Sequence, residues 1–277
     1  MEKYTNPSTK QDITLLALAD EGRVDLKSII IPISYLRQYT TCVIHLFVEK
    51  TLFTQHVSFF NEMQQTFGLE IETFTKGNVY IANYRIKLYR DFLIKNNFKY
   101  NRVLHCDVSD VYFQIDPFQY IGTLGKLVVF KEGCDGTKLL EDSKNTEWYR
   151  QCYPSMAPLT KDSVIINAGV VMGSSTYMLK YFTLIWALME NNNKCDIAVF
   201  GPDQAVVEYA FHSGLLNELI DRLECGCVYC DKVKMKNNML FDSNGCLMPF
   251  IHGRPPYYPQ SIITQNLENY KEITRLV

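Results

Sequence analysis

The chain has 277 residues and a mass of 32.1 kDa, and 47% of its residues are hydrophobic. Its 28 basic and 30 acidic residues give a net charge of −2, and the basic residues are scattered, which disfavours a nucleic-acid partner. This length allows one large α/β domain or two small ones, and the apolar fraction indicates a substantial core. Because the sequence shows no repeats and no clear linker, we expect a single domain across residues 1–277.

The ends of the chain and its longest apolar stretch bear on where the protein works. Residues 1–11 are polar and are expected to be flexible, and they contain no apolar leader. The longest apolar stretch, residues 177–189, is interrupted by Lys180 and is too short to cross a bilayer. The nine cysteines lack the spacing of a secreted scaffold, and Cys42 and Cys106 are typical of buried thiols. We therefore expect a cytoplasmic protein without a membrane span.

Strands and helices alternate in the first half of the chain. Apolar runs and helical spacing predict strands at 12–19, 41–48, 70–74 and 102–113, and helices at 24–39, 58–67 and 80–96. This order is typical of a Rossmann-like, mostly parallel sheet with helices on both faces. Ligands bind outside the carboxyl ends of such strands, where Asp20, Glu49, Asp107 and Asp110 follow. We expect these acids to face one crevice.

The second half is less regular. It contains predicted strands at 126–130 and 163–172, helices at 174–191 and 202–211, further strands within 225–247, and a short helix at 267–276. Residues 131–162 are polar and are predicted to form a long loop, which in a compact domain is usually functional.

The most informative stretch is RVLHCDVSDVYFQIDPF, residues 102–118, in which Asp107 and Asp110 end a buried strand. Two carboxylates this close repel each other, and each costs several kcal/mol to desolvate without a partner. A divalent cation removes both problems, and hard oxygen ligands suit Mg²⁺ or Mn²⁺ carried with a phosphate substrate. The ordinary alternative is a pair of solvated loop acids.

Two other kinds of site deserve comparison with this one. A zinc site would use Cys225, Cys227 and Cys230, with Cys246 and His252 downstream, but this spacing is not a standard paired one. A phosphatase would place its nucleophilic acid after the first strand, whereas these acids follow the fourth. Both are disfavoured.

Four short patches together resemble the glycogenin-like glycosyltransferases of the GT-A fold. They are the acids at 107–110, the Asn-Ala-Gly-Val run at 167–170, Asp203-Gln204 opening a helix, and His252-Gly253. They occur in the family's order within residues 12–256. The resemblance implies a GT-A fold and a metal-dependent hexosyltransferase. Its donor would be a nucleotide-diphosphate sugar, with a UDP-sugar favoured, and its acceptor a hydroxyl of a glycan, protein or small molecule.

The resemblance implies a metal site for Mn²⁺ or Mg²⁺ made by Asp107, Asp110 and His252. The family pattern is D-x-D, whereas this chain has D-x-x-D, with Ser109 where the second aspartate would fall. Either Asp110 takes over the metal or Asp107 holds it nearly alone.

Further residues are implied around the donor. Asn167 and Asp203 would flank the sugar as catalytic residues. Those assigned to the nucleotide and its phosphates are Ala19, Asp20, Ser109, Gly253, Arg254 and Arg85, with Arg90 as the fallback for Arg85. The alternative for each of these residues is a purely structural role, as a strand end, a residue in the first turn of a helix or a surface charge.

The stereochemistry and the acceptor side are less determined. The resemblance implies retention, for which no dedicated base is needed, whereas an inverting enzyme would use Glu132 or Asp135. Residues 131–162 would shape the acceptor side, where Trp148 or Tyr149 either stacks on a sugar or anchors the loop. The alternative function is a non-catalytic module that binds a nucleotide sugar or carbohydrate on the same fold.

Overall fold

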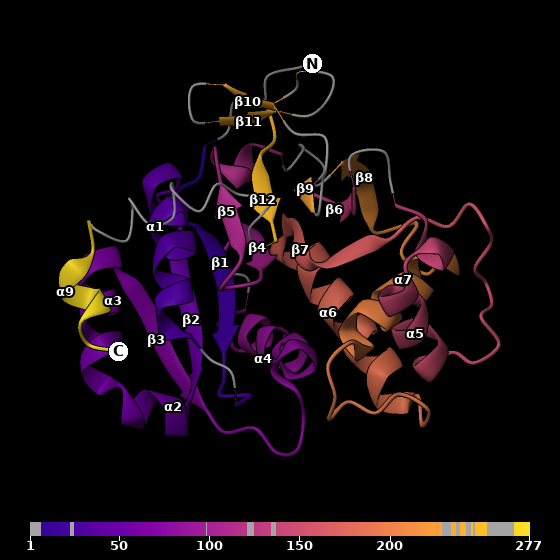
Figure 1. Ribbon diagram of the computed structural model, residues 1–277, viewed down its shortest axis with the longest axis horizontal. Helices are drawn as coiled ribbons and strands as arrows, with labels where there is room; N and C mark the ends of the chain where they lie inside the picture. Colours follow the sequence, from indigo (N-terminus) through magenta and orange to yellow (C-terminus); the bar gives the residue numbers. More distant parts are fainter. Residues whose placement is uncertain are drawn as a thin grey trace.

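A seven-stranded sheet forms the centre of the protein, with strand order β3-β2-β1-β4-β7-β6-β8 (Figure 1). The computed structural model describes residues 7–22, 25–97, 99–120, 125–133, 137–225, 227–228, 234–236, 239–241, 245, 247–253 and 269–277. The strands of this sheet are β1 (Asp12–Leu18), β2 (Val43–Glu49), β3 (Leu69–Phe74), β4 (Arg102–Cys106), β6 (Leu127–Lys131), β7 (Ile166–Ser174) and β8 (Ile220–Cys225). Only β7 runs antiparallel to its neighbours, β4 and β6. The predicted α/β architecture with a mostly parallel sheet is confirmed.

Helices cover both faces of the sheet (Figure 1). The longer ones are α1 (Ile30–Tyr39), α3 (Val57–Phe67), α4 (Ile81–Asn96), α5 (Ser143–Cys152), α6 (Ser175–Asn191) and α7 (Pro202–His212). Shorter helical turns lie at Leu26–Ile29, Lys50–Gln55 (α2), Pro117–Tyr120, Leu139–Glu141 and Lys271–Thr274 (α9). Most of the long helices were predicted within a few residues, because each carries an apolar stripe at helical spacing. None of the helices in the described ranges has both the length and the apolar character needed to cross a membrane.

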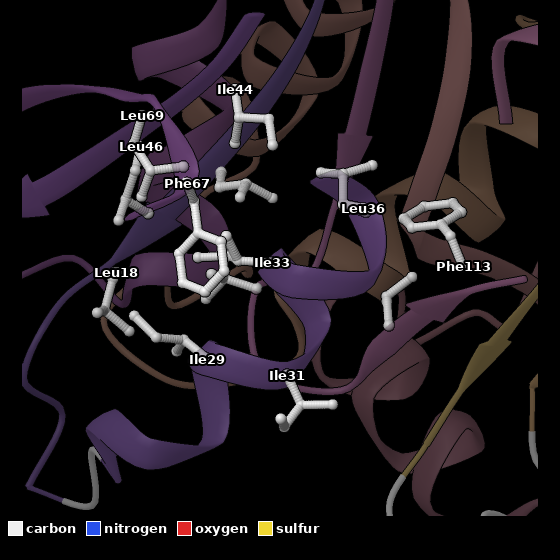
Figure 2. Close-up of a cluster of buried hydrophobic side chains, with 14 of the residues drawn as sticks. Leu18, Ile29, Ile31, Ile33, Leu36, Ile44, Leu46, Phe67, Leu69 and Phe113 are labelled. Carbon is white, nitrogen blue, oxygen red and sulfur yellow. The ribbon is translucent and has the colours of Figure 1, made fainter. Parts of the chain in front are cut away.

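The sheet divides the core in two because neighbouring strand residues point to opposite faces. In β1, Leu16 and Leu18 join the cluster under α1 and α3, whereas Ile13 and Leu15 join the cluster under α4, α6 and α7. Figure 2 shows the first cluster, with side chains of α1 packed beside those of β2, β3 and Phe67. Burying one such aliphatic or aromatic side chain contributes about 1.5–3 kcal/mol.

The prediction of one strand over residues 102–113 was wrong. The chain leaves the central sheet after Cys106, turns through Asp107–Asp110, and enters β5 (Val111–Phe113) of a separate three-stranded sheet. There β5 pairs antiparallel with β12 (Phe250–His252), which also pairs with β9 (Cys227–Val228). The break occurs where the acids interrupt the apolar run. Its consequence is that β12 places His252 opposite Val111, next to Asp110.

The predicted loop at 131–162 contains a helix. Asp142 caps α5 by accepting a 2.7 Å hydrogen bond from the backbone N–H of Asn145. The helix is polar overall, with Asn145, Tyr149 and Cys152 as its buried residues, and such a narrow buried stripe gives little periodic signal. Two further differences are α2, which was not predicted, and α9, which is shorter than the predicted 267–276.

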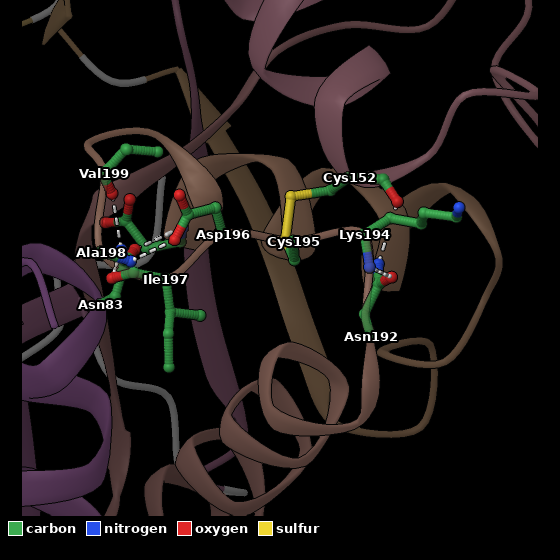
Figure 3. The surroundings of a disulfide bond; sticks show 10 residues. Asn83, Cys152, Asn192, Lys194, Cys195, Asp196, Ile197, Ala198 and Val199 are labelled. Carbon is green, nitrogen blue, oxygen red and sulfur yellow. Dashed lines mark hydrogen bonds between the residues drawn. A yellow bond between two sulfur atoms is a disulfide. The ribbon is translucent and has the colours of Figure 1, made fainter. Parts of the chain in front are cut away.

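One pair of cysteines forms a disulfide, Cys152–Cys195, between the end of α5 and the loop before α7 (Figure 3). Cys42 and Cys106 are free and buried, as predicted. Disulfides persist mainly in oxidising compartments, so this pair weighs against the predicted cytoplasmic location, which stays a prediction. The proposed zinc cluster lies outside the described side chains, apart from His252.

Candidate metal centre

Asp107, Asp110 and His252 converge in the folded chain. Each offers a potential metal-ligand atom, and these atoms all lie within 4.8 Å of one another. Nε2 of His252 is 3.1 Å from Oδ2 of Asp107 and 3.7 Å from Oδ1 of Asp110. The turn between β4 and β5 supplies the two acids, and the pairing of β12 with β5 supplies the imidazole. Two carboxylates and one imidazole suit Mn²⁺ or Mg²⁺ with further positions left for water or phosphate.

Gly169 leaves the space in which these groups meet. A Cβ atom at this position would lie 2.3 Å from Oδ2 of Asp107 and 2.4 Å from Cε1 of His252. The backbone of β7 also holds the acid directly, because the N–H of Asp107 donates to the carbonyl of Gly169 over 2.8 Å. The glycine noted in the strand sequence therefore has a physical reason: close approach of a ligand group to the backbone. The donor set and this cradle fit a small divalent cation.

Arg85 pairs with two acids, the half-buried Asp107 and the buried Asp203. From α4, its Nη1 contacts Oδ1 of Asp107, and its Nη2 lies 3.1 Å from Oδ2 of Asp203. The arginine is 7% exposed. Burial opposes its charge, but the two carboxylates outweigh burial and raise the pKa of the guanidinium. For Asp107, burial favours the neutral acid, but Arg85 and His252 hold the pKa of the carboxyl well below its usual range. The carboxyl group of Asp107 is therefore favoured in its ionised form in the folded protein.

The surroundings of His252 favour its protonated form. Burial disfavours the imidazolium, but Asp110 and Asp107 outweigh burial and raise the pKa of His252 to about 9. A metal ligand must be the neutral imidazole, so a cation that enters here displaces this proton. We therefore expect metal binding at neutral pH to release a proton.

Asn167 links His252 to β7 and to Glu132. Its Oδ1 accepts a 3.0 Å hydrogen bond from the N–H of Gly169 and lies 3.2 Å from Nδ1 of His252. Its Nδ2 donates to Oε1 of Glu132 over 3.0 Å. Burial raises the pKa of Glu132. This polar side chain in an apolar strand thus finds its partners within the protein, where it orients the imidazole of His252. Its predicted place beside the sugar stays a prediction.

Asp203 lies in the first turn of α7, where Gly201 caps the helix and Pro202 begins it. Its backbone N–H donates to Oδ1 of Asn83 over 2.9 Å, and its carboxylate faces Arg85. Burial raises the pKa of Asp203, although Arg85 opposes this. Asp203 thus belongs to the same buried ion network as Asp107, through one shared arginine.

The structure distinguishes among the other predicted residues. It brings together Arg85, Asp107, Asp110, Asn167, Asp203 and His252. Ser109 is half-buried in the turn between the acids. Gly253 follows β12, and its N–H donates to the carbonyl of Asp110 over 3.0 Å. The fallback, Arg90, instead pairs with Asp91, its neighbour on α4. Arg254 and Asp135 lie outside the described residues.

Ala19 and Asp20 follow β1 as predicted. Ala19 is buried, and the N–H of exposed Asp20 donates to Oε2 of Glu49 over 3.1 Å, so these two strand ends do meet. Asp20 lines a surface pocket of about 350 Å³, whose other lining residues are Asp25, Leu26, Lys27, Leu52, Gln55, His56 and Val277. None of the metal-ligand candidates lines this pocket, so the expectation of a single crevice is not supported.

Two buried residues of α7, Gln204 and Glu208, support the strand that carries Asn167. Gln204 accepts from the N–H of Ala168 over 3.0 Å and donates to the carbonyl of Ile166 over 2.6 Å. Glu208 accepts from the N–H of Ile166 over 2.7 Å. Their support of β7 was missed by sequence reasoning. The sequence feature that could have predicted it is a pair of polar residues four positions apart, and so on one face, in a mostly apolar helix.

Glu208 should make stability depend on pH. It is 1% exposed, and burial raises its pKa from 4.5 to about 7. The folded protein binds this proton more tightly than the unfolded chain does. The contribution of Glu208 to the free energy of unfolding is therefore full below about pH 4.5 and is lost as the pH rises through 7. Its size is about 3 kcal/mol.

Glu208→Gln keeps an oxygen for the N–H of Ile166 and removes the ionisation. We expect a clearly smaller fall in the free energy of unfolding between pH 4.5 and 8, measured by urea denaturation. The exposed Glu147→Gln serves as control and should behave like the original chain. An unchanged pH slope in Glu208→Gln would show that the buried carboxyl does not titrate in this range.

A scan against models of protein families finds no match, and a search of curated proteins also returns none. Fold and site together define an α/β protein with a candidate metal centre beside the β4–β5 turn.

Proposed function

We propose that the protein is a metal-dependent glycosyltransferase of the GT-A fold. It moves a sugar from a nucleotide-diphosphate donor, a UDP-sugar by preference, to an acceptor hydroxyl. The observation that carries the proposal is the convergence of Asp107, Asp110 and His252, whose potential ligand atoms lie within 4.8 Å of one another. These are the residues that the resemblance implies for the metal. The mostly parallel sheet with helices on both faces supports the GT-A assignment at the level of architecture.

Asp107, Asp110 and His252 would hold the ion. A divalent metal bound there supplies positive charge that neutralises the departing diphosphate. The protein's own contribution is to hold the ligands in place before the donor arrives. Arg85 fixes one oxygen of Asp107 and leaves the other facing His252, while Asn167 fixes the far side of the imidazole. Arg85 is thereby assigned to positioning the acids.

Asp20 borders a surface pocket of about 350 Å³ whose lining includes none of the candidate metal ligands, so the place of the nucleotide beside Ala19 and Asp20 stays a prediction. Retention is proposed because of the resemblance. Glu132, one of the two candidate bases for inversion, is 9% exposed and is hydrogen-bonded to Asn167, which limits its access to an acceptor.

A thermal-shift screen of nucleotide sugars, with and without Mn²⁺, tests the proposal. We expect one UDP-sugar with Mn²⁺ to stabilise the protein more than either compound alone. At a hundred times its dissociation constant a ligand adds about 2.7 kcal/mol. Asp110→Asn should remove the metal-dependent part of the shift, whereas the surface variant Asp91→Asn should retain it. Absence of any shift across UDP-, GDP- and other nucleotide sugars would refute the proposal.

The non-catalytic alternative is tested with the same reagents. Many glycosyltransferases slowly hydrolyse their donor when no acceptor is present. Release of nucleoside diphosphate with Mn²⁺ would support the enzyme, and tight donor binding without hydrolysis or transfer would favour the binding module.

A further inference from the structure

Three aromatic side chains, Tyr80, Trp148 and Phe200, meet at the surface; we call them the aromatic patch. The ring of Phe200 lies 5.0 Å from that of Trp148 and 5.3 Å from that of Tyr80, in edge-to-face contacts. Nζ of Lys144 lies 4.8 Å from the centre of the Trp148 ring and 5.6 Å from that of Phe200. Phe200 is 47% exposed. An aromatic ring this exposed, grouped with two others, is a candidate contact surface.

Gly201 is what allows Trp148 to lie in this patch. A Cβ atom at Gly201 would lie 2.5 Å from Cγ and Cδ1 of the indole, and the residue has a φ of +115°. The indole therefore packs directly on the backbone. Tyr149, the next residue, is fully buried and donates its hydroxyl to the carbonyl of Ala157 over 2.8 Å. Of the two aromatics singled out in the sequence, Tyr149 anchors α5 and Trp148 faces the surface.

The loop that carries Phe200 is fixed at several points (Figure 3). At its start, Cys195 is bonded to Cys152 of α5. Further along, Nδ2 of Asn83 donates to the carbonyls of Ile197 and Val199 over 2.9 and 2.8 Å. These contacts fix the backbone next to Phe200 and so keep its ring exposed. A surface held in its bound shape loses little entropy when it binds.

The aromatic patch adjoins the candidate metal centre through two helices. Tyr80 caps α4, the helix that carries Arg85. Phe200 and Gly201 lead directly into α7, where Asp203 contacts Arg85, which in turn contacts Asp107. A molecule bound on the patch would therefore lie beside the first turn of α7, next to the predicted sugar-flanking residue.

We propose that the aromatic patch is the acceptor subsite and that it takes a carbohydrate, with a sugar ring packed on the exposed ring of Phe200 beside Trp148. This rests on the proposed function, because only a transferase needs an acceptor there. A pyranose has a face of C–H groups, which suits an aromatic surface, and a rim of hydroxyls. The ammonium of Lys144 has three donors for that rim. The aromatic patch therefore combines apolar aromatic area with a hydrogen-bond donor at its edge.

Binding of maltotriose, lactose and chitotriose tests this subsite. The chain has two tryptophans, and Trp186 is 5% exposed in the core, so emission in a Trp186→Phe variant reports on Trp148 alone. We expect at least one saccharide to change that emission. Saturation-transfer NMR on the unsubstituted chain should give the same ranking of saccharides, which guards against an effect of Trp186→Phe on folding.

Phe200→Ala should weaken that binding at least tenfold. Leu215→Ala is the matched control, because Leu215 is also 47% exposed and lies beyond the other end of α7, and binding should be unchanged. The proposal is overturned if no saccharide binds, if a peptide binds in place of all three, or if both variants weaken binding equally. Donor and Mn²⁺ are absent from this assay, so its failure leaves the nucleotide-sugar result standing. A failed donor screen with saccharide binding intact would instead refute the proposed reaction, and with it the acceptor role, and would leave the aromatic patch as a saccharide-binding surface.

Discussion

Arg85→Met is expected to lower the free energy of unfolding by about 3–5 kcal/mol in metal-free buffer. The arginine is buried and shared between Asp107 and Asp203, so its loss leaves Asp203 without the cation it contacts among the described residues. Methionine fills similar volume but cannot donate hydrogen bonds. The measurement is urea denaturation at pH 7 for the original chain and the variant.

Arg90→Met provides the matched control on the same helix. Arg90 pairs with Asp91 at the surface, where such pairs contribute about 0–1 kcal/mol. A second variant, Arg85→Met with Asp203→Asn, should recover part of the lost stability because it removes the orphaned carboxylate. Equal stability of the Arg85→Met and Arg90→Met proteins would contradict the assignment of Arg85 as the common counter-ion.

Gly169→Ala is expected to weaken Mn²⁺ binding about 100-fold. The new Cβ would lie 2.3 Å from Oδ2 of Asp107 and 2.4 Å from Cε1 of His252, so one or both ligands must move. Ligand geometry is what a metal site requires, and displacement by even one ångström changes coordination. Electron paramagnetic resonance of free Mn²⁺ during titration measures the change.

Gly173→Ala, on the same strand, controls for loss of stability. There a Cβ would meet the end of the Leu127 side chain at 3.1 Å, away from the ligands. We expect some destabilisation and unchanged Mn²⁺ affinity. If Gly169→Ala binds Mn²⁺ as tightly as Gly173→Ala, the metal does not lie in the cradle between Asp107 and His252.

The parts of the fold that were predictable are those with a strong local pattern. Strands β1 and β2 are apolar on both faces, and α4 repeats apolar residues at helical spacing, so both kinds of element were identified within a few residues. The acids at 107 and 110 were identified because charge at the end of a buried strand is unfavourable without a partner.

What was missed depends on contacts between distant segments. The pairing of β5 with β12 brings His252 to Asp110, but a three-residue strand carries almost no periodic signal. Helix α5 is stabilised by its cap, by the buried Tyr149 and by the disulfide at its end. Most of its residues are polar, so the sequence shows no apolar repeat that would predict a helix. The sharing of Arg85 between Asp107 and Asp203 joins residues more than a hundred positions apart. No local rule predicts such a partner.

Calorimetric titration of Mn²⁺ into the original chain and into Asp110→Asn tests the central claim most directly. We predict that one Mn²⁺ binds per chain, with proton release at neutral pH as the ion displaces the proton of His252, whose pKa is raised to about 9. Asp110→Asn should lose most of that affinity. Binding of Mn²⁺ with the same affinity in both proteins, or no binding to the original chain in the presence of UDP-sugars, would contradict the account.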